Sequence, residues 1–116
     1  MNCFNVMIIA AQWPALHPIQ PNSHRMEHLI HFTSQGLQLA GVLQIPDNLP
    51  PGQKCAAIVV LHGFGSNKNG GISMAASKLF ASLGYITLRF DMRGCGDSQG
   101  QRGKVICMEQ VQDTQA

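Results

Sequence analysis

Ser98 is the first residue whose surroundings suggest chemistry. The segment Gly96-Asp97-Ser98-Gln99-Gly100 matches G-x-S-x-G, the pattern in which a serine attacks a carbonyl carbon in acyl transfer. That chemistry needs a strand that runs into the serine and a helix that leaves it. Here the strand-like residues end near Phe90, and residues 99–103 make a poor helix start. We therefore interpret Ser98 as a coincidental match rather than a catalytic nucleophile.

Two glycine-containing loops hold the other polar candidates, one over residues 62–71 and one over residues 91–103. In the second loop, Asp91 and Arg93 are close enough in sequence to tie the ends of the loop through charge-assisted hydrogen bonds. Gly94 and Gly96 permit turns with positive φ. This loop is predicted to be mainly structural.

The elements that position these loops follow from hydrophobic periodicity. Residues 28–33 and 37–45 are two strand candidates joined around residues 34–36, which is typical of an antiparallel hairpin with one solvated face. Residues 56–61 form a continuous apolar run rich in β-branched side chains. That run predicts a strand buried on both faces, as in a parallel sheet, with Cys55 at its start.

A helix is predicted between the two loops, followed by a further strand over residues 85–90. Gly84 marks the end of the helix, and another helix is expected from Val105 onward. The residues that form one apolar face of the first helix are Ile72, Ala75, Ala76, Leu79, Phe80 and Leu83. Because a strand, a helix and a strand in succession imply a parallel pair, the sequence predicts an α/β architecture opened by an antiparallel hairpin.

Residues 58–68 and 84–100 together resemble the α/β-hydrolases. Two motifs account for this resemblance: a strand ending in His62-Gly63-Phe64, and a strand followed by D-x-R-G-x-G-D-S from Asp91 to Ser98. The likeness is strongest to the cinnamoyl/feruloyl-esterase-like branch and the related serine aminopeptidases, and it covers about residues 27–116. It implies the N-terminal part of an α/β-hydrolase fold, truncated before the nucleophile strand.

The resemblance implies a serine hydrolase that acts on a small-molecule carboxylic ester or on an acyl-peptide bond. Acyl transfer builds negative charge on a carbonyl oxygen, and in this fold one backbone donor for that charge comes from the loop after the third strand. The family pattern puts the N–H of Phe64 in this oxyanion hole and its side chain on the acyl pocket. Gly63 is expected to let the chain turn sharply where a Cβ would clash.

The same resemblance assigns supporting roles to the remaining motif residues. The family order is serine, acid, then histidine, so a catalytic histidine would come last. His62 precedes the other parts of the motif, and we interpret it as a loop-orienting residue beside Gly63, Asp91, Arg93, Gly94 and Gly96. No histidine follows Ser98, so this chain cannot complete a triad and is expected to be inactive alone.

The family's strand order runs 1-2-4-3-5, which would leave the strand over residues 56–61 at an open edge. An apolar unpaired edge favours association, so the chain is expected to self-associate there. Two alternatives remain beside the enzymatic one. The chain could be a non-catalytic partner that accepts a strand from another protein, or it could be a nonfunctional remnant.

Composition excludes several other classes. The chain has 116 residues, of which 45% are hydrophobic and 12% charged, and its basic residues are scattered rather than clustered, so nucleic-acid binding is not indicated. The glycine spacings fit neither a dinucleotide fingerprint nor a phosphate-binding loop, and no metal-ligand spacing occurs, so no cofactor or metal is expected.

Location and domain limits follow from the cysteines and the N-terminus. The cysteines lack C-x-x-C spacing and are interpreted as reduced thiols of a cytoplasmic protein. The apolar run of residues 6–11 is too short to span a bilayer, so no membrane association is expected. Residues 1–25 are interpreted as an irregular extension, with Met26 as a possible true start, and residues 26–116 as the partial hydrolase domain.

Overall fold

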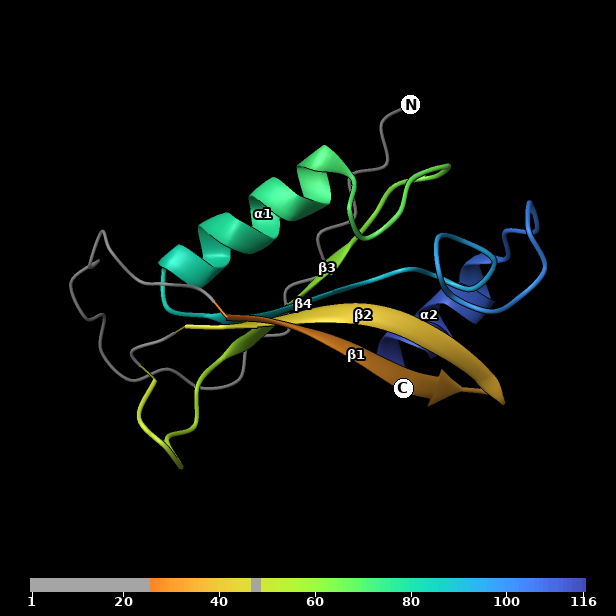
Figure 1. The fold of residues 1–116 in the computed structure, drawn as a ribbon. Helices are drawn as coiled ribbons and strands as arrows, with labels where there is room; N and C mark the ends of the chain where they lie inside the picture. The colour runs from red at the N-terminus through yellow and green to blue at the C-terminus, as the bar shows by residue number, and fades with distance from the viewer. Residues whose placement is uncertain (1–25, 47–48) are drawn as a thin grey trace.

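The structure is a computed structural model that describes residues 26–46 and 49–116 (Figure 1). The extension expected over residues 1–25 lies outside the described residues. The described elements, in chain order, are β1 (Met26–Ser34), β2 (Leu37–Ile45), β3 (Ala57–Leu61), α1 (Gly71–Ser82), β4 (Ile86–Phe90) and α2 (Cys107–Gln115).

The expected hairpin is confirmed, and β1 is longer than predicted. β1 and β2 pair antiparallel along their full lengths, from Met26 opposite Ile45 to Ser34 opposite Leu37. The connecting residues Gln35 and Gly36 have φ values of 47° and 79°. Positive φ at both central residues is the type I′ geometry whose twist matches that of paired strands.

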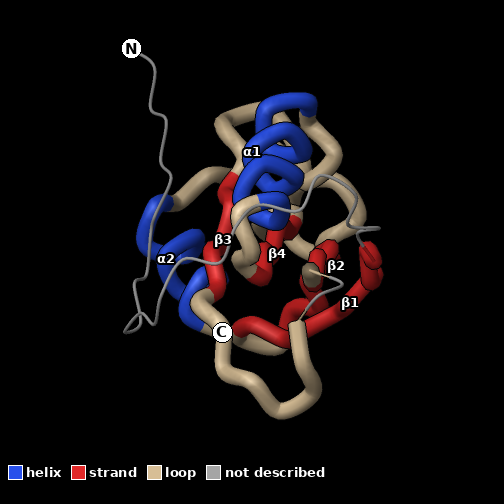
Figure 2. The backbone as a smooth tube through the Cα atoms, turned by 90° about the vertical axis from the view of Figure 1, so that its left-hand side faces the viewer, coloured by secondary structure: helices blue, strands red, loops and turns tan. Residues whose placement is uncertain are grey.

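The predicted parallel unit is also confirmed. β3 and β4 pair parallel, β4 pairs antiparallel with β2, and the strand order is β1-β2-β4-β3. The order agrees with the family pattern, and within the described part of the chain β3 is an edge strand that pairs with β4 alone. α1 lies across one face of this sheet, as both views show (Figures 1 and 2).

One apolar cluster of the core lies on the face of the sheet opposite α1, while the buried Val42, Ile58 and Val60 lie on the face beneath α1. Thr87 faces α1, because its hydroxyl lies 2.6 Å from the hydroxyl of Ser77 in that helix. Side chains alternate along a strand, so Phe90 points to the other face. There Phe90 packs with Leu39 and Met92, and its ring meets that of Phe32 edge-to-face at 5.2 Å.

The prediction that the third strand is buried on both faces is wrong. In β3, Ile58 and Val60 are buried, whereas Val59 and Leu61 are only half-buried. The strand also begins at Ala57, so Cys55 precedes it rather than starting it. The half-buried side chains of Val59 and Leu61 share the face opposite α1, the helix that packs on the other face of β3.

The apolar face expected for the first helix is not the face that packs on the sheet. The residues of α1 that face the sheet are Ser73, Ser77 and Ala81, while Ile72 and Leu79 are 70% and 57% exposed. The sheet beneath the helix carries polar side chains, and buried polar groups require hydrogen-bonding partners. Ser77 supplies them, because its hydroxyl contacts both Gln44 (3.1 Å) and Thr87 (2.6 Å).

Helix boundaries agree with the glycine signal. α1 ends at Ser82, and Gly84 follows with a φ of 90°. The second helix begins at Cys107, slightly later than expected.

No helix among the described residues is long and apolar enough to cross a membrane. Cys55, Cys95 and Cys107 carry free thiols.

Candidate functional site

The two candidate loops begin side by side. Leu61 and Phe90, the last residues of β3 and β4, are register partners in the parallel pair. The chain therefore leaves both strands at the same edge of the sheet, where open α/β sheets bind ligands. The loop over residues 62–70 then leads into α1, and the loop over residues 91–106 leads into α2.

His62 links the two loops from a buried position. Its Nε2 accepts a hydrogen bond from the backbone N–H of Met92 at 3.1 Å, and its Nδ1 lies 2.9 Å from the carbonyl oxygen of Gly63. Since Nε2 accepts, Nδ1 must carry the proton and donate it to that carbonyl. Because the Nε2 lone pair already accepts the Met92 N–H, it is not open to take a proton from a nucleophile. The contacts of the ring instead orient the loop.

The turn after His62 presents Phe64 to solvent. Ser66 N–H donates to the Gly63 carbonyl at 3.2 Å, and Gly65 has a φ of 70°, as the third residue of a type II turn requires. The Phe64 side chain is 88% exposed, and no described residue accepts a hydrogen bond from its backbone N–H. The turn therefore leaves one backbone donor at the end of β3 without an acceptor in the part of the chain that the structure describes.

The reason expected for Gly63 is wrong. A Cβ at this position would meet no atom within 4 Å among the described residues, and Gly63 is not among the positive-φ glycines. The position that needs a positive φ is Gly65, because the turn places its third residue in the left-handed region.

Lys68, near the end of the first loop, lies in a buried ion-pair network. Its Nζ lies 2.6 Å from one carboxylate oxygen of Asp91 and 2.5 Å from Asp97, and its backbone N–H donates to the other Asp91 oxygen at 2.6 Å. The lysine is 4% exposed and Asp91 is fully buried. Two loops are thus joined by charge-assisted hydrogen bonds to a single carboxylate.

These contacts shift the pKa values of both partners. Burial alone would raise the pKa of Asp91, but the hydrogen bonds from the side chain and backbone of Lys68 and from the backbone of Asp97 outweigh it and lower the pKa. Burial would likewise lower the pKa of Lys68, yet its hydrogen bonds with Asp91 and Asp97 raise it. Both groups are therefore charged at neutral pH.

Arg93 pairs with α2 rather than with its own loop. The sequence suggested that Asp91 and Arg93 together tie the ends of the loop, but Asp91 binds Lys68 instead. Arg93 donates hydrogen bonds to Asp113, at 3.0 Å from Nε and 2.6 Å from a terminal nitrogen. The hydrogen bonds with Asp113 raise the pKa of Arg93 above its usual value. The prediction missed this because Asp113 lies twenty residues away in sequence.

The two glycines of the second loop are required by geometry. Gly94 and Gly96 have φ values of 74° and 48°. A Cβ on Gly94 would strike the backbone of Gln101, and one on Gly96 would strike the Asp91 carboxylate. Gly96 therefore keeps open the space in which Asp91 meets Lys68.

Ser98 holds its loop against β2. Its hydroxyl donates to the carbonyl of Asp91 at 2.5 Å and accepts from the backbone N–H of Ala40 at 2.9 Å. The residue is 8% exposed and lies in a loop, with no strand leading into it. The hydroxyl proton is directed to a backbone carbonyl and not to a base.

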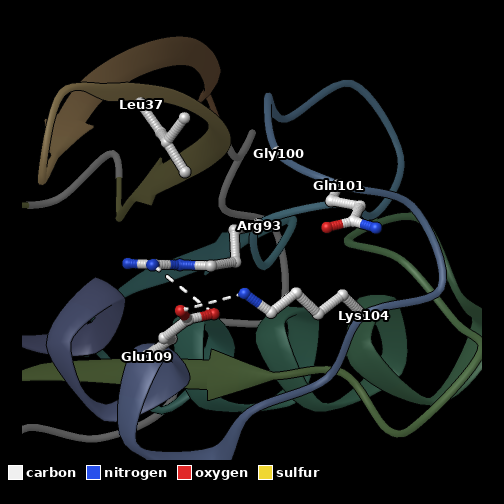
Figure 3. Close-up of a pocket in the computed structure, with 6 residues that line it drawn as sticks. All are labelled: Leu37, Arg93, Gly100, Gln101, Lys104 and Glu109. Atoms are coloured by element: carbon white, nitrogen blue, oxygen red, sulfur yellow. Dashed lines mark ion pairs between the residues drawn. The ribbon is translucent and has the colours of Figure 1, made fainter.

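A small pocket of about 160 Å³ lies beside the second loop (Figure 3). Glu109 lies between Arg93 and Lys104 there, at 3.7 Å and 3.6 Å from their side-chain nitrogens. The remaining lining residues are Leu37, Gly100 and Gln101. Arg93 and Lys104 share the Glu109 carboxylate, and Arg93 also pairs with Asp113 outside the pocket. Within the described ranges, no group of three or more His, Cys, Asp or Glu side chains could hold a metal ion.

The ion pairs of Lys68, Asp97 and Asp113 were not predicted from the sequence. One signal was available for Lys68, because loops that follow neighbouring parallel strands meet at one edge of the sheet, which brings a lysine of one loop near an aspartate of the other. No comparable signal existed for Asp113.

No protein-family model matches the chain. An uncharacterised 31.7 kDa protein from the traX-finO intergenic region of Escherichia coli is 31% identical over 83 residues, which cover 72% of this chain and 27% of that protein. The chain therefore spans about a quarter of the length of this curated relative.

Several solved structures are similar in fold, including the three that follow. The hypothetical protein PA2218 from Pseudomonas aeruginosa has a TM-score of 0.70 at 27% identity, covering 97% of this chain and 35% of its own. Est1E from Butyrivibrio proteoclasticus, solved with ferulic acid bound, has a TM-score of 0.68 at 26% identity over 74% of this chain and 34% of its own. The α/β-hydrolase GrgF from a Penicillium species has a TM-score of 0.61 at 29% identity over 78% of this chain and 29% of its own.

The likeness agrees with the strand order, the parallel β3-α1-β4 unit and the two loop motifs. The chain has the N-terminal portion of the α/β-hydrolase fold.

Proposed function

We propose that this chain supplies the oxyanion loop of a serine hydrolase that cleaves carboxylic esters or acyl-peptide bonds. The observation that carries the proposal is the backbone N–H of Phe64, which has no acceptor among the described residues and lies in a turn at the carboxyl end of β3. A donor aimed at a developing oxyanion must not be occupied by the protein itself. The nucleophile, the acid and the histidine would come from the part of the fold that this chain does not span.

The substrate class rests on the neighbours. Est1E binds ferulic acid, an aromatic carboxylic acid, and it is 26% identical to this chain over the shared portion. An ester of an aromatic carboxylic acid is therefore the preferred substrate, and an acyl-peptide bond is the alternative. The exposed ring of Phe64 would line the acyl side of such a site. The triad and the oxyanion hole need no cofactor.

A cytoplasmic location is part of the same proposal. The thiols of Cys55, Cys95 and Cys107 are free, and disulfides are characteristic of oxidising compartments instead.

Ser98 is not the nucleophile in this proposal, because its hydroxyl is held by Asp91 and Ala40. A Ser98→Ala variant of an active, longer protein that contains this chain should keep kcat within about threefold, well short of the loss of ~10⁴ or more seen when a triad serine is removed. A loss of several orders of magnitude would make Ser98 the nucleophile.

The activity can be tested with a chimera in which residues 26–116 replace the corresponding portion of Est1E. A fluorophosphonate probe should label the chimera and leave the isolated chain unlabelled. Phe64→Pro removes the N–H and should lower kcat by ~10²–10³, the usual effect of losing one oxyanion donor. Phe64→Ala is the matched control, because it keeps the N–H and loses only the ring. Equal kcat values for the two variants would refute the role of the Phe64 N–H.

We also propose that the isolated chain self-associates through β3. This strand pairs on one side only within the described residues, and the side chains on its face opposite α1 are apolar and either exposed (Ala57) or half-buried (Val59 and Leu61). An open apolar edge is a template for strand pairing. Sedimentation should show a mass that rises with concentration, and Val59→Lys should reduce the association. A concentration-independent monomer would contradict this.

A further inference from the structure

The loop over residues 62–70 is anchored at its two ends. Few contacts attach the residues between these ends to the rest of the described structure. At the first end, His62 accepts the N–H of Met92. At the other end, Lys68 meets Asp91 and Asp97, and the Lys68 carbonyl accepts a hydrogen bond from Arg89 Nε at 3.0 Å.

The residues between these anchors are mostly exposed. Gly63, Phe64, Gly65 and Asn67 are all exposed, and Ser66 is half-buried. The Ser66–Gly63 hydrogen bond closes the turn but does not attach it to the sheet. The orientation of the turn is therefore set by its two ends.

Lys68 holds its end with both its backbone and its side chain. The N–H and Nζ of Lys68 each contact a different oxygen of the same Asp91 carboxylate, at 2.6 Å in both cases. Binding through two points fixes the direction of the backbone as well as its position. Asp97 adds a second carboxylate on the solvent side, where its side chain is 75% exposed.

We propose that Lys68 is a positioning residue that fixes the Phe64 N–H through Asp91. The proposal rests on the proposed function, because an oxyanion donor is effective only when its direction is set before the reaction begins. Lys68 does not touch the reacting atoms. It orders the segment that carries the donor.

The test uses the full 116-residue chain and needs no catalysis. Lys68→Met removes the ammonium and keeps the aliphatic stem and the backbone N–H. Lys78→Met is the matched control, since Lys78 lies exposed on α1. The NMR order parameter of the Phe64 N–H should fall from about 0.85 to below about 0.6 in Lys68→Met alone. The exchange rate of the Ser66 amide should rise at least about tenfold, as expected when a charge-assisted hydrogen bond is lost.

A merely structural role predicts a different pattern. If Lys68 only stabilised the whole sheet, amide exchange in β2 and β4 would accelerate together with the loop, and Phe64 would stay ordered in the folded state. That result, or an unchanged order parameter for Phe64, overturns the proposal. Should Lys68→Met fail to fold, Asp97→Asn removes the exposed carboxylate and should lower the Phe64 order parameter in the same direction.

Coupling through Asp91 can be tested separately. The effects of Lys68→Met and Asp91→Asn on the Phe64 order parameter should be non-additive, because both remove the same contact. In the Est1E chimera, Lys68→Met should lower kcat with little change in KM, since the donor acts in the transition state. If the chimera never hydrolyses esters while Phe64 still depends on Lys68, the proposed function fails and the ordering of the loop by Lys68 stands.

Discussion

Replacing Asp113 with alanine should detach α2 and leave the sheet intact. Asp113 is 1% exposed and is the only buried residue of this helix. Its carboxylate accepts hydrogen bonds from the side chain of Arg93 and, at 3.3 Å, from the Arg93 backbone. A hydrogen bond from Ser34 also favours the charged form of the carboxylate. One carboxylate therefore joins α2 to the second loop and to the end of β1.

The magnitude follows from the burial of the pair. Removing one partner of a buried ion pair typically costs ~3–5 kcal/mol, because the other charge loses its partner. Arg93 keeps hydrogen-bond contact with Gln35 and lies 3.7 Å from Glu109, and its side chain is 11% exposed. The lower end, about 3 kcal/mol, is therefore expected, which corresponds to a rise of over ~100-fold in the population of detached helix. A detached α2 should unfold, since isolated helices shorter than ~12 residues are marginal in water.

Hydrogen exchange measured by NMR separates the local effect from a global one. In Asp113→Ala, amides of residues 110–115 should lose protection, while amides of β2 and β4 should keep theirs. Glu109→Ala is the matched control on the same helix, because its ion pairs with Arg93 and Lys104 are longer and partly exposed. The reasoning would be refuted if Asp113→Ala changed the protection of α2 by less than about fivefold, which corresponds to ~1 kcal/mol, or if the sheet lost as much protection as the helix.

Three further predictions concern stability. The pKa values of Asp91 and Asp113 are lowered in the folded state. Their contribution to the free energy of unfolding is therefore present above the ordinary pKa of 3.8, and it is lost as the pH falls below that value through the folded pKa values. Urea midpoints should fall over that acidic range, and a variant with both aspartates changed to asparagine should show a flatter pH dependence. Ser77→Ala should cost about 1–2 kcal/mol in urea unfolding, because Gln44 and Thr87 lose a buried partner, and an unchanged midpoint would contradict this. Gly96→Ala should destabilise the chain more than Gly36→Ala in thermal melts, since both glycines have positive φ but only Gly96 faces a carboxylate at close range; equal losses would mean that backbone strain alone decides.

Several features could be predicted from the sequence because they depend on neighbours in the chain. The hairpin over β1 and β2 follows from strand-like residues on both sides of a tight turn at Gln35 and Gly36. The helix end at Gly84 follows from a residue that can adopt positive φ. The choice of Phe64 as an oxyanion donor came from the family motif, and it stays a prediction.

The inner face of α1 could not be predicted from apolar spacing. Ile72, Leu79 and Leu83 share a face, yet that face is turned outward. The orientation of the helix depends on the sheet face beneath it, which offers, beside the buried apolar side chains of Ile58 and Val60, the polar side chains of Gln44 and Thr87. Small hydroxyl-bearing residues fit above them, and a large apolar residue would leave two polar groups without partners.

The sequence by itself determined the order of strands and helices, the hairpin turn and the two loop motifs at the ends of β3 and β4, since these depend on periodicity and on glycines in particular places. Only the tertiary structure decided the partners of the charged residues. Asp91 pairs with Lys68 and Arg93 pairs with Asp113, although Asp91 and Arg93 are close in sequence. The physical reason is burial: a charge removed from water must find its counter-charge among the groups that the fold brings beside it, and sequence distance does not measure that proximity.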